Sequence, residues 1–317
     1  MIVVNRSEKY IARLMFQLKI HTSDGQIYEN LFSKVMFKHN PNFRMVKPHG
    51  NIGDRKNDGF DKTRGVYYQV FAPENIEKAK TISDAVKKLK EDFNGLKTHW
   101  HALCPIKEFY YVVNDKYKGL PPNVEQEILI IDSENPGIIC DTFSSNKLET
   151  VFMSLVEDDM IDIIGILPND EIGFLDFDDL NKAVEYLIHS ESDISLDTLV
   201  EDPDFETKII FNKLSSVIAN LLNVASYQIG DLETYFMNTG EYVKNELKMR
   251  FKNLYKQAKE VISDQEIDFA DQRFLYILNN ASPNGKKAVK DAVLVLMSFY
   301  FEACDIFEKP EKPLEVE

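Results

Sequence analysis

GFDKTRGVYYQVFAP, residues 59–73, contains the clearest strand pattern in the chain. Its second half is rich in β-branched and aromatic residues, namely Val66, Tyr67, Val70 and Phe71. Residues of these types are enriched in strands because they fit a pleated, half-buried surface. Pro73 should end the strand, since proline has no N–H group to donate to a neighbouring strand. We therefore expect a buried strand that stops before Pro73.

The segments on either side of this strand alternate helical and extended patterns. Apolar residues recur every three or four positions over 25–39 and over 76–97, which predicts two amphipathic helices. Further strands are expected over 42–48, 109–113 and 137–140, and further helices near residues 123 and 146. Helices that alternate with strands favour an α/β fold in which helices flank a mixed sheet.

The chain changes character after residue 155. We predict an α/β domain over 1–155, an acidic helical connector over 156–205, and an all-α domain for assembly or partner binding over 206–317. Residues 288–307 are apolar on most sides, so they form either the centre of a bundle or a partner surface. We favour the centre of a bundle, although the same segment also makes a homo-oligomer an expectation.

Charge is distributed unevenly along the 317 residues, whose net charge is −15. Residues 1–120 contain 21 Lys and Arg against 13 Asp and Glu, whereas the remaining residues contain 16 against 39. A basic first part is compatible with a nucleic-acid surface, and it is equally compatible with charge that only keeps both parts soluble. Charge alone therefore leaves the partner open.

From the composition and the lack of a recognisable targeting signal, we expect a cytoplasmic protein. The hydrophobic fraction of 44% and the charged fraction of 28% are ordinary for a globular protein and exclude a disordered or fibrous chain. The N-terminus shows no secretory signal pattern, and the uncharged run 214–230 is too short and too polar to cross a membrane. Three widely spaced cysteines fit a reducing compartment.

Acidic and amide residues cluster in GNIGDRKNDGF (50–60) and in GVYYQVFAPE (65–74). Asp58 at the head of a strand, Gln69 on the next strand and Glu29 on the preceding helix can converge on one divalent cation. Mg²⁺ takes hard oxygen ligands and keeps several waters, so these three side chains would suffice, and Mn²⁺ could replace it. Such an ion can activate water for phosphodiester hydrolysis. Basic residues that could hold phosphates surround the motif: Lys47, Arg55, Lys56, Lys62 and Arg64.

Simpler interpretations of the same residues exist. An Asp-Gly pair between two strands is common in ordinary turns. An EF-hand is disfavoured, because Lys56 and Gly65 stand where that loop needs oxygen ligands. His99, His101 and Cys104 lack the spacing of a zinc site, and the chain has no phosphate-binding loop motif.

The order of a helical Glu, GDRKNDGF and YYQVF resembles the PD-(D/E)xK restriction-endonuclease-like nucleases, most closely their Mrr-type variant. Over nearly the whole chain, runs such as KKLKEDFNGL, IKEFYYVVNDKYKGLPPNVE and YFEACDIFEKP resemble effectors of bacterial ABC three-component (Lamassu-like) defence systems. This resemblance implies a restriction-endonuclease-like first domain. It also implies a nuclease held by an SMC-like ABC ATPase and a third subunit, and released to cut DNA during phage infection.

One position departs from the nuclease pattern. The three expected metal ligands match it, but Phe71 stands where the family has a catalytic lysine. That lysine would position water or stabilise charge on the phosphate. Lys78 or Lys80 of the following helix could replace it, and we expect Lys78 to do so; Glu74 is a further carboxylate that could enter the site.

The function expected is thus a DNA endonuclease of low sequence specificity. The alternatives are a catalytically inactive DNA-binding or assembly subunit and a stand-alone protein-interaction module.

Overall fold

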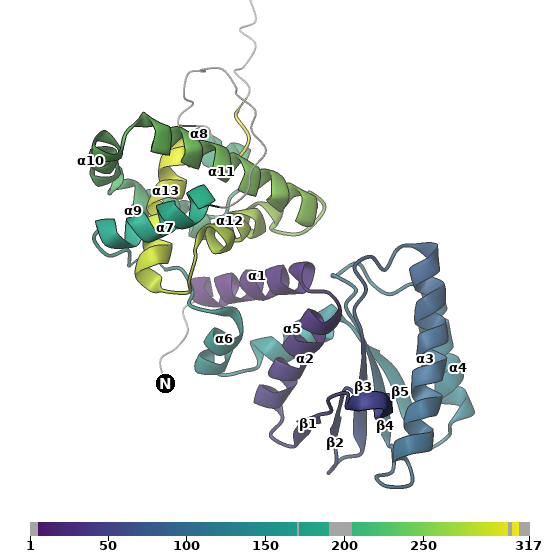
Figure 1. Ribbon diagram of the computed structural model, residues 1–317. Coiled ribbons are helices and arrows are strands. Elements are labelled where there is room, and N and C mark those ends of the chain that lie inside the picture. Colours follow the sequence, from purple (N-terminus) through teal and green to yellow (C-terminus); the bar gives the residue numbers. More distant parts are fainter. Residues whose placement is uncertain (1–5, 170, 190–204, 304–305, 311–317) are drawn as a thin grey trace, which may run out of the picture. The chain divides into compact units, whose positions relative to one another are not determined.

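The computed structural model describes residues 6–169, 171–189, 205–303 and 306–310, and Figure 1 shows its ribbon. The chain divides into two compact units. We call Lys19–Ile164 the α/β unit, and Met1–Leu18 together with Gly165–Glu317 the helical unit. Within the predicted connector 156–205, residues 170 and 190–204 lie outside the described residues.

A five-stranded sheet forms the centre of the α/β unit, with its strands in the order β1-β2-β3-β4-β5. The strands are β1 (Phe43–Met45), β2 (Gly59–Asp61), β3 (Val66–Phe71), β4 (Glu108–Val113) and β5 (Ile139–Phe143). The first three strands pair antiparallel and the last three pair parallel. The helical elements of this unit are α2 (Gly25–His39), η1 (Gly50–Ile52), α3 (Ala79–Trp100), α4 (Pro122–Glu134), α5 (Ser145–Met153) and α6 (Glu157–Ile164). The parallel pairs are joined through α3 and α4, because parallel strands need a crossover connection.

Helices cover both faces of the sheet. Figure 1 shows α3 and α4 on one face and α2 and α5 on the other. Successive residues of a strand point to opposite faces. Tyr67 of β3 belongs to the hydrophobic core beneath α3 and α4, whereas Tyr68 packs against Phe32 of α2 with ring centroids 5.4 Å apart. Both faces of β3 are therefore buried, as expected for a strand without polar alternation.

The predicted α/β architecture with a mixed sheet is confirmed in this unit. The helix predicted over 25–39 is α2, and the helix predicted over 76–97 begins three residues later, at Ala79, and ends at Trp100. The strand predicted over 42–48 is shorter than expected. Only Phe43–Met45 pair, because β2 offers just three partner residues.

The helical unit consists of helices connected by loops throughout its described residues. They are α1 (Arg6–Thr22, up to Leu18), α7 (Phe177–His189), α8 (Phe205–Phe211), α9 (Ser216–Ser226), α10 (Ile229–Thr239), α11 (Glu241–Val261), α12 (Phe269–Ala281) and α13 (Lys287–Glu302). α13 packs against α7, α9, α10 and α12, and its side chains from Val293 to Met297 are fully buried. The apolar segment 288–307 is thus largely core within this chain, so its hydrophobicity no longer supports the expected homo-oligomer.

Within the described ranges, every helix falls short of the length and hydropathy that a membrane crossing requires.

Candidate functional site

Asp58 and Gln69 lie beside each other where β2 begins next to β3. Asp58 comes directly before β2: its N–H donates to the carbonyl oxygen of Tyr68 at 3.2 Å, and its carboxylate accepts a hydrogen bond from the N–H of Val70. Side chains alternate along a strand, so Gln69 points to the same face as Tyr67, which belongs to the core beneath α3 and α4. Both side chains are buried, with 5% and 4% of their surface exposed. The structure therefore places two of the three predicted metal ligands near each other.

The backbone fixes the orientation of the Asp58 carboxylate. The N–H of Val70 donates to Asp58 Oδ2 at 2.6 Å. No described residue hydrogen-bonds to the other carboxylate oxygen, Oδ1. Gln69 has a similar acceptor, because its buried Oε1 finds no hydrogen-bond partner in the described part of the chain. An unsatisfied buried oxygen costs about 1–3 kcal/mol, so the Gln69 oxygen suits a bound cation or an ordered water.

The charges around Asp58 point to the same conclusion. Burial, together with the negative charges of Glu29 and Asp54, raises the pKa of Asp58 to about 7. The N–H of Val70 and the positive charge of Lys88 act in the opposite direction. Glu29 is on α2 with 18% of its side chain exposed. A divalent cation favours the charged form of a carboxylate, so Asp58 and the Gln69 oxygen suit Mg²⁺ or Mn²⁺.

This pKa predicts how the stability contributed by Asp58 changes with pH. The folded pKa lies above the unfolded value of about 3.9, so the folded state holds the extra proton between roughly pH 4 and pH 7. The stability that Asp58 contributes is fully present below about pH 4 and is lost as the pH rises through 7. Asp58→Asn removes this dependence. Between about pH 5 and pH 8, we expect the free energy of unfolding of the variant, relative to wild type, to rise by about 2 kcal/mol. Urea unfolding in EDTA measures this difference, and an equal difference at both pH values would contradict it.

A second buried carboxylate, Asp92 of α3, holds two lysines near Asp58. Its side chain is fully buried, and it pairs with Lys88 Nζ at 2.5 Å and with Lys56 Nζ at 2.8 Å. The hydrogen bond to Asp92 raises the pKa of Lys56. The charges of both acids also act on Tyr111: burial raises the pKa of its hydroxyl, and the charges of Asp92 and Asp58 add to this. Lys88 of α3, the helix that follows β3, is therefore close enough for its charge to act on Asp58.

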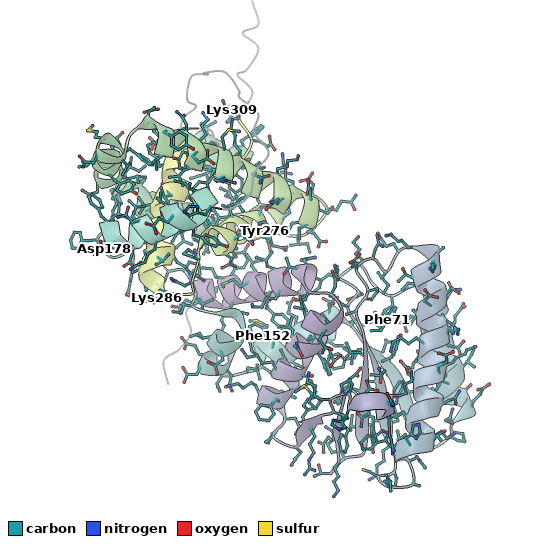
Figure 2. The ribbon with its side chains drawn as sticks, viewed as in Figure 1. Phe71, Phe152, Asp178, Tyr276, Lys286 and Lys309 are labelled. Atoms are coloured by element: carbon teal, nitrogen blue, oxygen red, sulfur yellow. The ribbon has the colours of Figure 1, made fainter. Side chains whose placement is uncertain are left out.

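Phe71 occupies the position where the nuclease pattern has its lysine. Its ring stacks on Tyr111 with centroids 5.9 Å apart and an interplanar angle of 15°, and Figure 2 shows it at the end of the sheet next to α3. Lys78 is the exposed N-cap of α3, and Lys80 is also exposed. Lys88, which the sequence reasoning missed, is the helical lysine whose charge acts on Asp58. Asp92, four residues later on the buried side of α3, was the signal that could have identified it.

The predicted phosphate-binding residues divide between two places. Lys47 Nζ lies 3.2 Å from Asn30 Oδ1 and 4.0 Å from Glu29 Oε1, and Lys56 is held by Asp92, so both lie at the site. Lys62 and Arg64 lie in the turn between β2 and β3, at the opposite end of these strands from Asp58. The predicted residue Arg55 is exposed, and its carbonyl accepts a hydrogen bond from Trp100 Nε1 at 3.2 Å.

No group of three or more His, Cys, Asp or Glu side chains among the described residues lies close enough together to hold a metal ion. The predicted ligand set has only two side chains of these types, the carboxylates of Glu29 and Asp58, and its third ligand is the amide oxygen of Gln69. Mg²⁺ retains several waters and can be bound by one or two carboxylates, so such a set is sufficient for it.

Comparison with known proteins gives one match, and it lies in the helical unit. Residues 178–308, which begin in α7 and end after α13, match the family model of C-terminal domain 10 of the ABC-three component (ABC-3C) systems. No curated protein and no solved structure matches the chain. The helical unit is therefore similar to this C-terminal domain over residues 178–308.

Proposed function

We propose that the chain is a metal-dependent DNA endonuclease subunit of an ABC three-component defence complex, and that it hydrolyses phosphodiesters with little sequence preference. The observation that carries this proposal is the closeness of two buried side chains, Asp58 and Gln69: no described residue hydrogen-bonds to Asp58 Oδ1 or to the buried Oε1 of Gln69. The α/β unit also has the mixed sheet flanked by helices that the sequence pattern predicted, and Glu29, Asp58 and Gln69 are the positions at which the chain resembles PD-(D/E)xK nucleases. The ABC-3C domain suggests partnership with the other subunits of such a system, which in this proposal are an SMC-like ABC ATPase and a third subunit.

Each residue has a definite role in this proposal. Asp58, Gln69 and Glu29 hold Mg²⁺, or Mn²⁺ in its place, through their oxygen atoms. When bound, the ion would supply Lewis-acid chemistry at the phosphate and lower the pKa of water. The N–H of Val70 keeps the Asp58 carboxylate oriented. Lys88 supplies positive charge for the phosphate at the transition state, in place of the lysine that the nuclease family has at the position of Phe71.

The role of Lys88 leads to a first activity prediction. We expect Lys88→Ala to lower metal-dependent cleavage about a hundredfold, because removal of one electrostatic stabiliser typically has this effect. Lys87→Ala is the matched control, since Lys87 is the adjacent residue on α3 and its side chain is 74% exposed. Lys78→Ala tests the residue favoured by sequence. Rates of plasmid nicking at saturating Mg²⁺ measure all three variants, and equal rates for Lys87→Ala and Lys88→Ala would remove Lys88 from the site.

Plasmid cleavage tests the proposed function directly. The purified chain is incubated with supercoiled plasmid and Mg²⁺ or Mn²⁺, first alone and then with the other subunits of its complex. We expect nicked and linear products that EDTA prevents and that added metal restores. Manganese binding, measured separately by calorimetry, shows whether the site forms. A chain that neither binds Mn²⁺ nor cuts DNA, alone or in its complex, contradicts the proposal.

A second function is favoured by a specific observation. Phe71 is packed on Tyr111, and Asp92 holds both nearby lysines, so this α/β unit could serve as a catalytically inactive DNA-binding or assembly subunit. Such a subunit would bind DNA in the complex without cutting it at any metal concentration. DNA retention without cleavage, together with unchanged retention in Lys88→Ala, would favour this alternative.

A further inference from the structure

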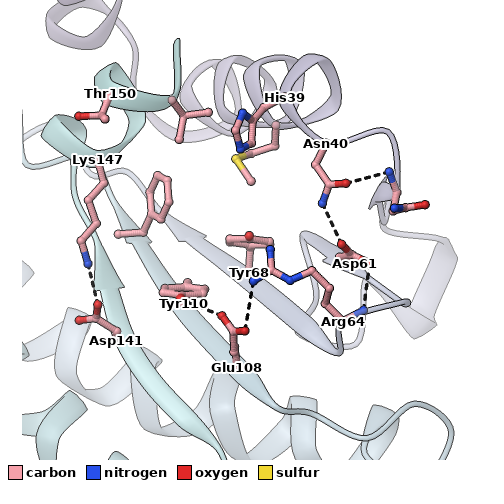
Figure 3. Close-up of a pocket in the computed structure, with 14 residues that line it drawn as sticks. His39, Asn40, Asp61, Arg64, Tyr68, Glu108, Tyr110, Asp141, Lys147 and Thr150 are labelled. Atoms are coloured by element: carbon pink, nitrogen blue, oxygen red, sulfur yellow. Dashed lines mark hydrogen bonds and ion pairs between the residues drawn. The ribbon is translucent and has the colours of Figure 1, made fainter. Parts of the chain in front are cut away.

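A pocket of about 540 Å³ opens on the other face of the sheet, between the strands and the helices α2 and α5 (Figure 3). Its strand residues include Tyr68 of β3, Tyr110 of β4 and Phe143 at the end of β5, on the face of the sheet opposite Gln69. Three aromatic rings form its floor. Tyr68 and Tyr110 stack with centroids 5.6 Å apart, and Phe143 meets both edge-on at 6.3 and 6.2 Å. This volume is within the range of small-molecule sites, and the floor suits a flat ligand.

The acidic residues of this pocket are already satisfied within the protein. Three carboxylates line it, and each accepts hydrogen bonds from neighbouring groups. Asp61 accepts from Asn40, Thr63 and the N–H of Arg64; Glu108 accepts from Arg64 and Tyr110; and Asp141 accepts from Lys147 and the N–H of Thr142. The lining acids are therefore not the groups that would bind a ligand.

Hydrogen-bond donors remain available in the same pocket. Tyr68 is only 7% exposed, and no described residue hydrogen-bonds to its hydroxyl. Arg64 has a side chain that is 63% exposed and makes one ion pair, at 3.3 Å. Lys147 is 46% exposed and donates to Asp141 Oδ2 and to the carbonyl oxygen of Thr142, each at 2.6 Å. Figure 3 shows these two cations on either side of the tyrosines. Exposed ion pairs contribute little, so an anion can compete for both cations. The pocket thus offers an aromatic floor, a tyrosine hydroxyl and two cations.

We propose that this pocket binds a nucleotide. The base lies against the aromatic floor and accepts a hydrogen bond from Tyr68, and the phosphate is held by Arg64 and Lys147. A base provides both a flat apolar face and acceptor atoms on its edge, and a phosphate can accept from both cations at once. The nucleotide is either free in solution or an unpaired unit of a nucleic-acid strand, since both present the same groups. This site is separate from the proposed nuclease site, so either can exist without the other.

Binding by the full chain in EDTA tests the proposal without involving the metal site. The probes are the four ribonucleoside monophosphates, measured by calorimetry, and a fluorescein-labelled oligothymidylate, measured by anisotropy. Thr150→Trp fills the pocket from an exposed position of α5 that lines it. Asn146→Trp is the matched control, one turn earlier on the same helix, exposed and outside the lining. Tyr68→Phe removes the hydroxyl while it keeps the ring.

The expected results separate the two sources of the nucleotide. We expect Thr150→Trp to abolish binding and Asn146→Trp to leave it within about twofold of wild type. Tyr68→Phe should weaken binding about 2- to 12-fold, the value of one hydrogen bond. Binding of free monophosphates identifies a soluble ligand, and binding of the oligonucleotide alone identifies an unpaired strand. Absence of saturable binding by every probe, or equal binding by the two tryptophan variants, overturns the proposal.

Discussion

Asp58→Asn is expected to lower metal-dependent DNA cleavage about a thousandfold, which corresponds to about 4 kcal/mol of transition-state stabilisation. The asparagine has the shape of the aspartate, and its side-chain oxygen can still accept the hydrogen bond that the N–H of Val70 donates. It carries no negative charge, so the proposed site loses one of its two carboxylates. Mg²⁺ is bound mainly by such hard, charged oxygens, and the affinity for the metal should fall together with the rate.

Asp54→Asn is the control for this prediction. Asp54 lies in the same loop, and its charge acts on Asp58, but its side chain accepts a hydrogen bond from the N–H of Lys56 and is outside the proposed ligand set. We expect this variant to retain cleavage within about tenfold of wild type. Plasmid nicking gives the rates, and calorimetric titration with Mn²⁺ gives the affinities. Equal losses in the two variants would show that only the overall negative charge of the loop matters, and would argue against Asp58 as a ligand.

Much of the α/β fold was predictable because its signals are local. The apolar spacing over 25–39 gave α2 with its observed ends, and the β-branched and aromatic residues of 59–73 contain β3. The closeness of Asp58 to Gln69 was also within reach, because a short turn between two strands brings the residues at their outer ends near each other. These predictions depend only on period and turn length, which a single sequence contains.

What could not be predicted depends on contacts between distant residues. That the charge of Lys88 acts on Asp58 depends on how α3 packs on the sheet, and the periodicity of a helix does not specify this. Likewise, residues 6–18 fall within the predicted 1–155 domain, yet the structure groups Met1–Leu18 with the helical unit. There the hydroxyl of Tyr10 donates to Asp271 Oδ2 at 2.7 Å, a contact between residues 261 positions apart. Sequence patterns carry no information about pairings of this range.

A buried lysine in the helical unit should have a large effect on stability. Lys208 of α8 has only 1% of its surface exposed. Its Nζ donates to the carbonyl oxygens of Phe301 and Ile306 at 2.5 and 2.8 Å, and it lies 4.4 Å from the centre of the Phe301 ring. Carbonyls at the end of a helix have no partner inside it, and they favour a positive charge. Lys208 therefore closes the C-terminal end of α13 within the matched ABC-3C domain.

We expect Lys208→Ala to lower the free energy of unfolding of the helical unit by about 3–5 kcal/mol. It removes two charge-assisted hydrogen bonds, leaves buried carbonyls without a partner and opens a cavity. Lys208→Met should cost less, because it keeps the apolar stem in place and loses only the ammonium group. Lys256→Ala, at an exposed position of α11, is the control and should change stability by no more than about 0.5 kcal/mol. Hydrogen exchange of the α13 amides reports this unit separately from the α/β unit. If α13 exchanged equally fast in Lys208→Ala and Lys256→Ala, Lys208 would not be the residue that holds this end of the helix.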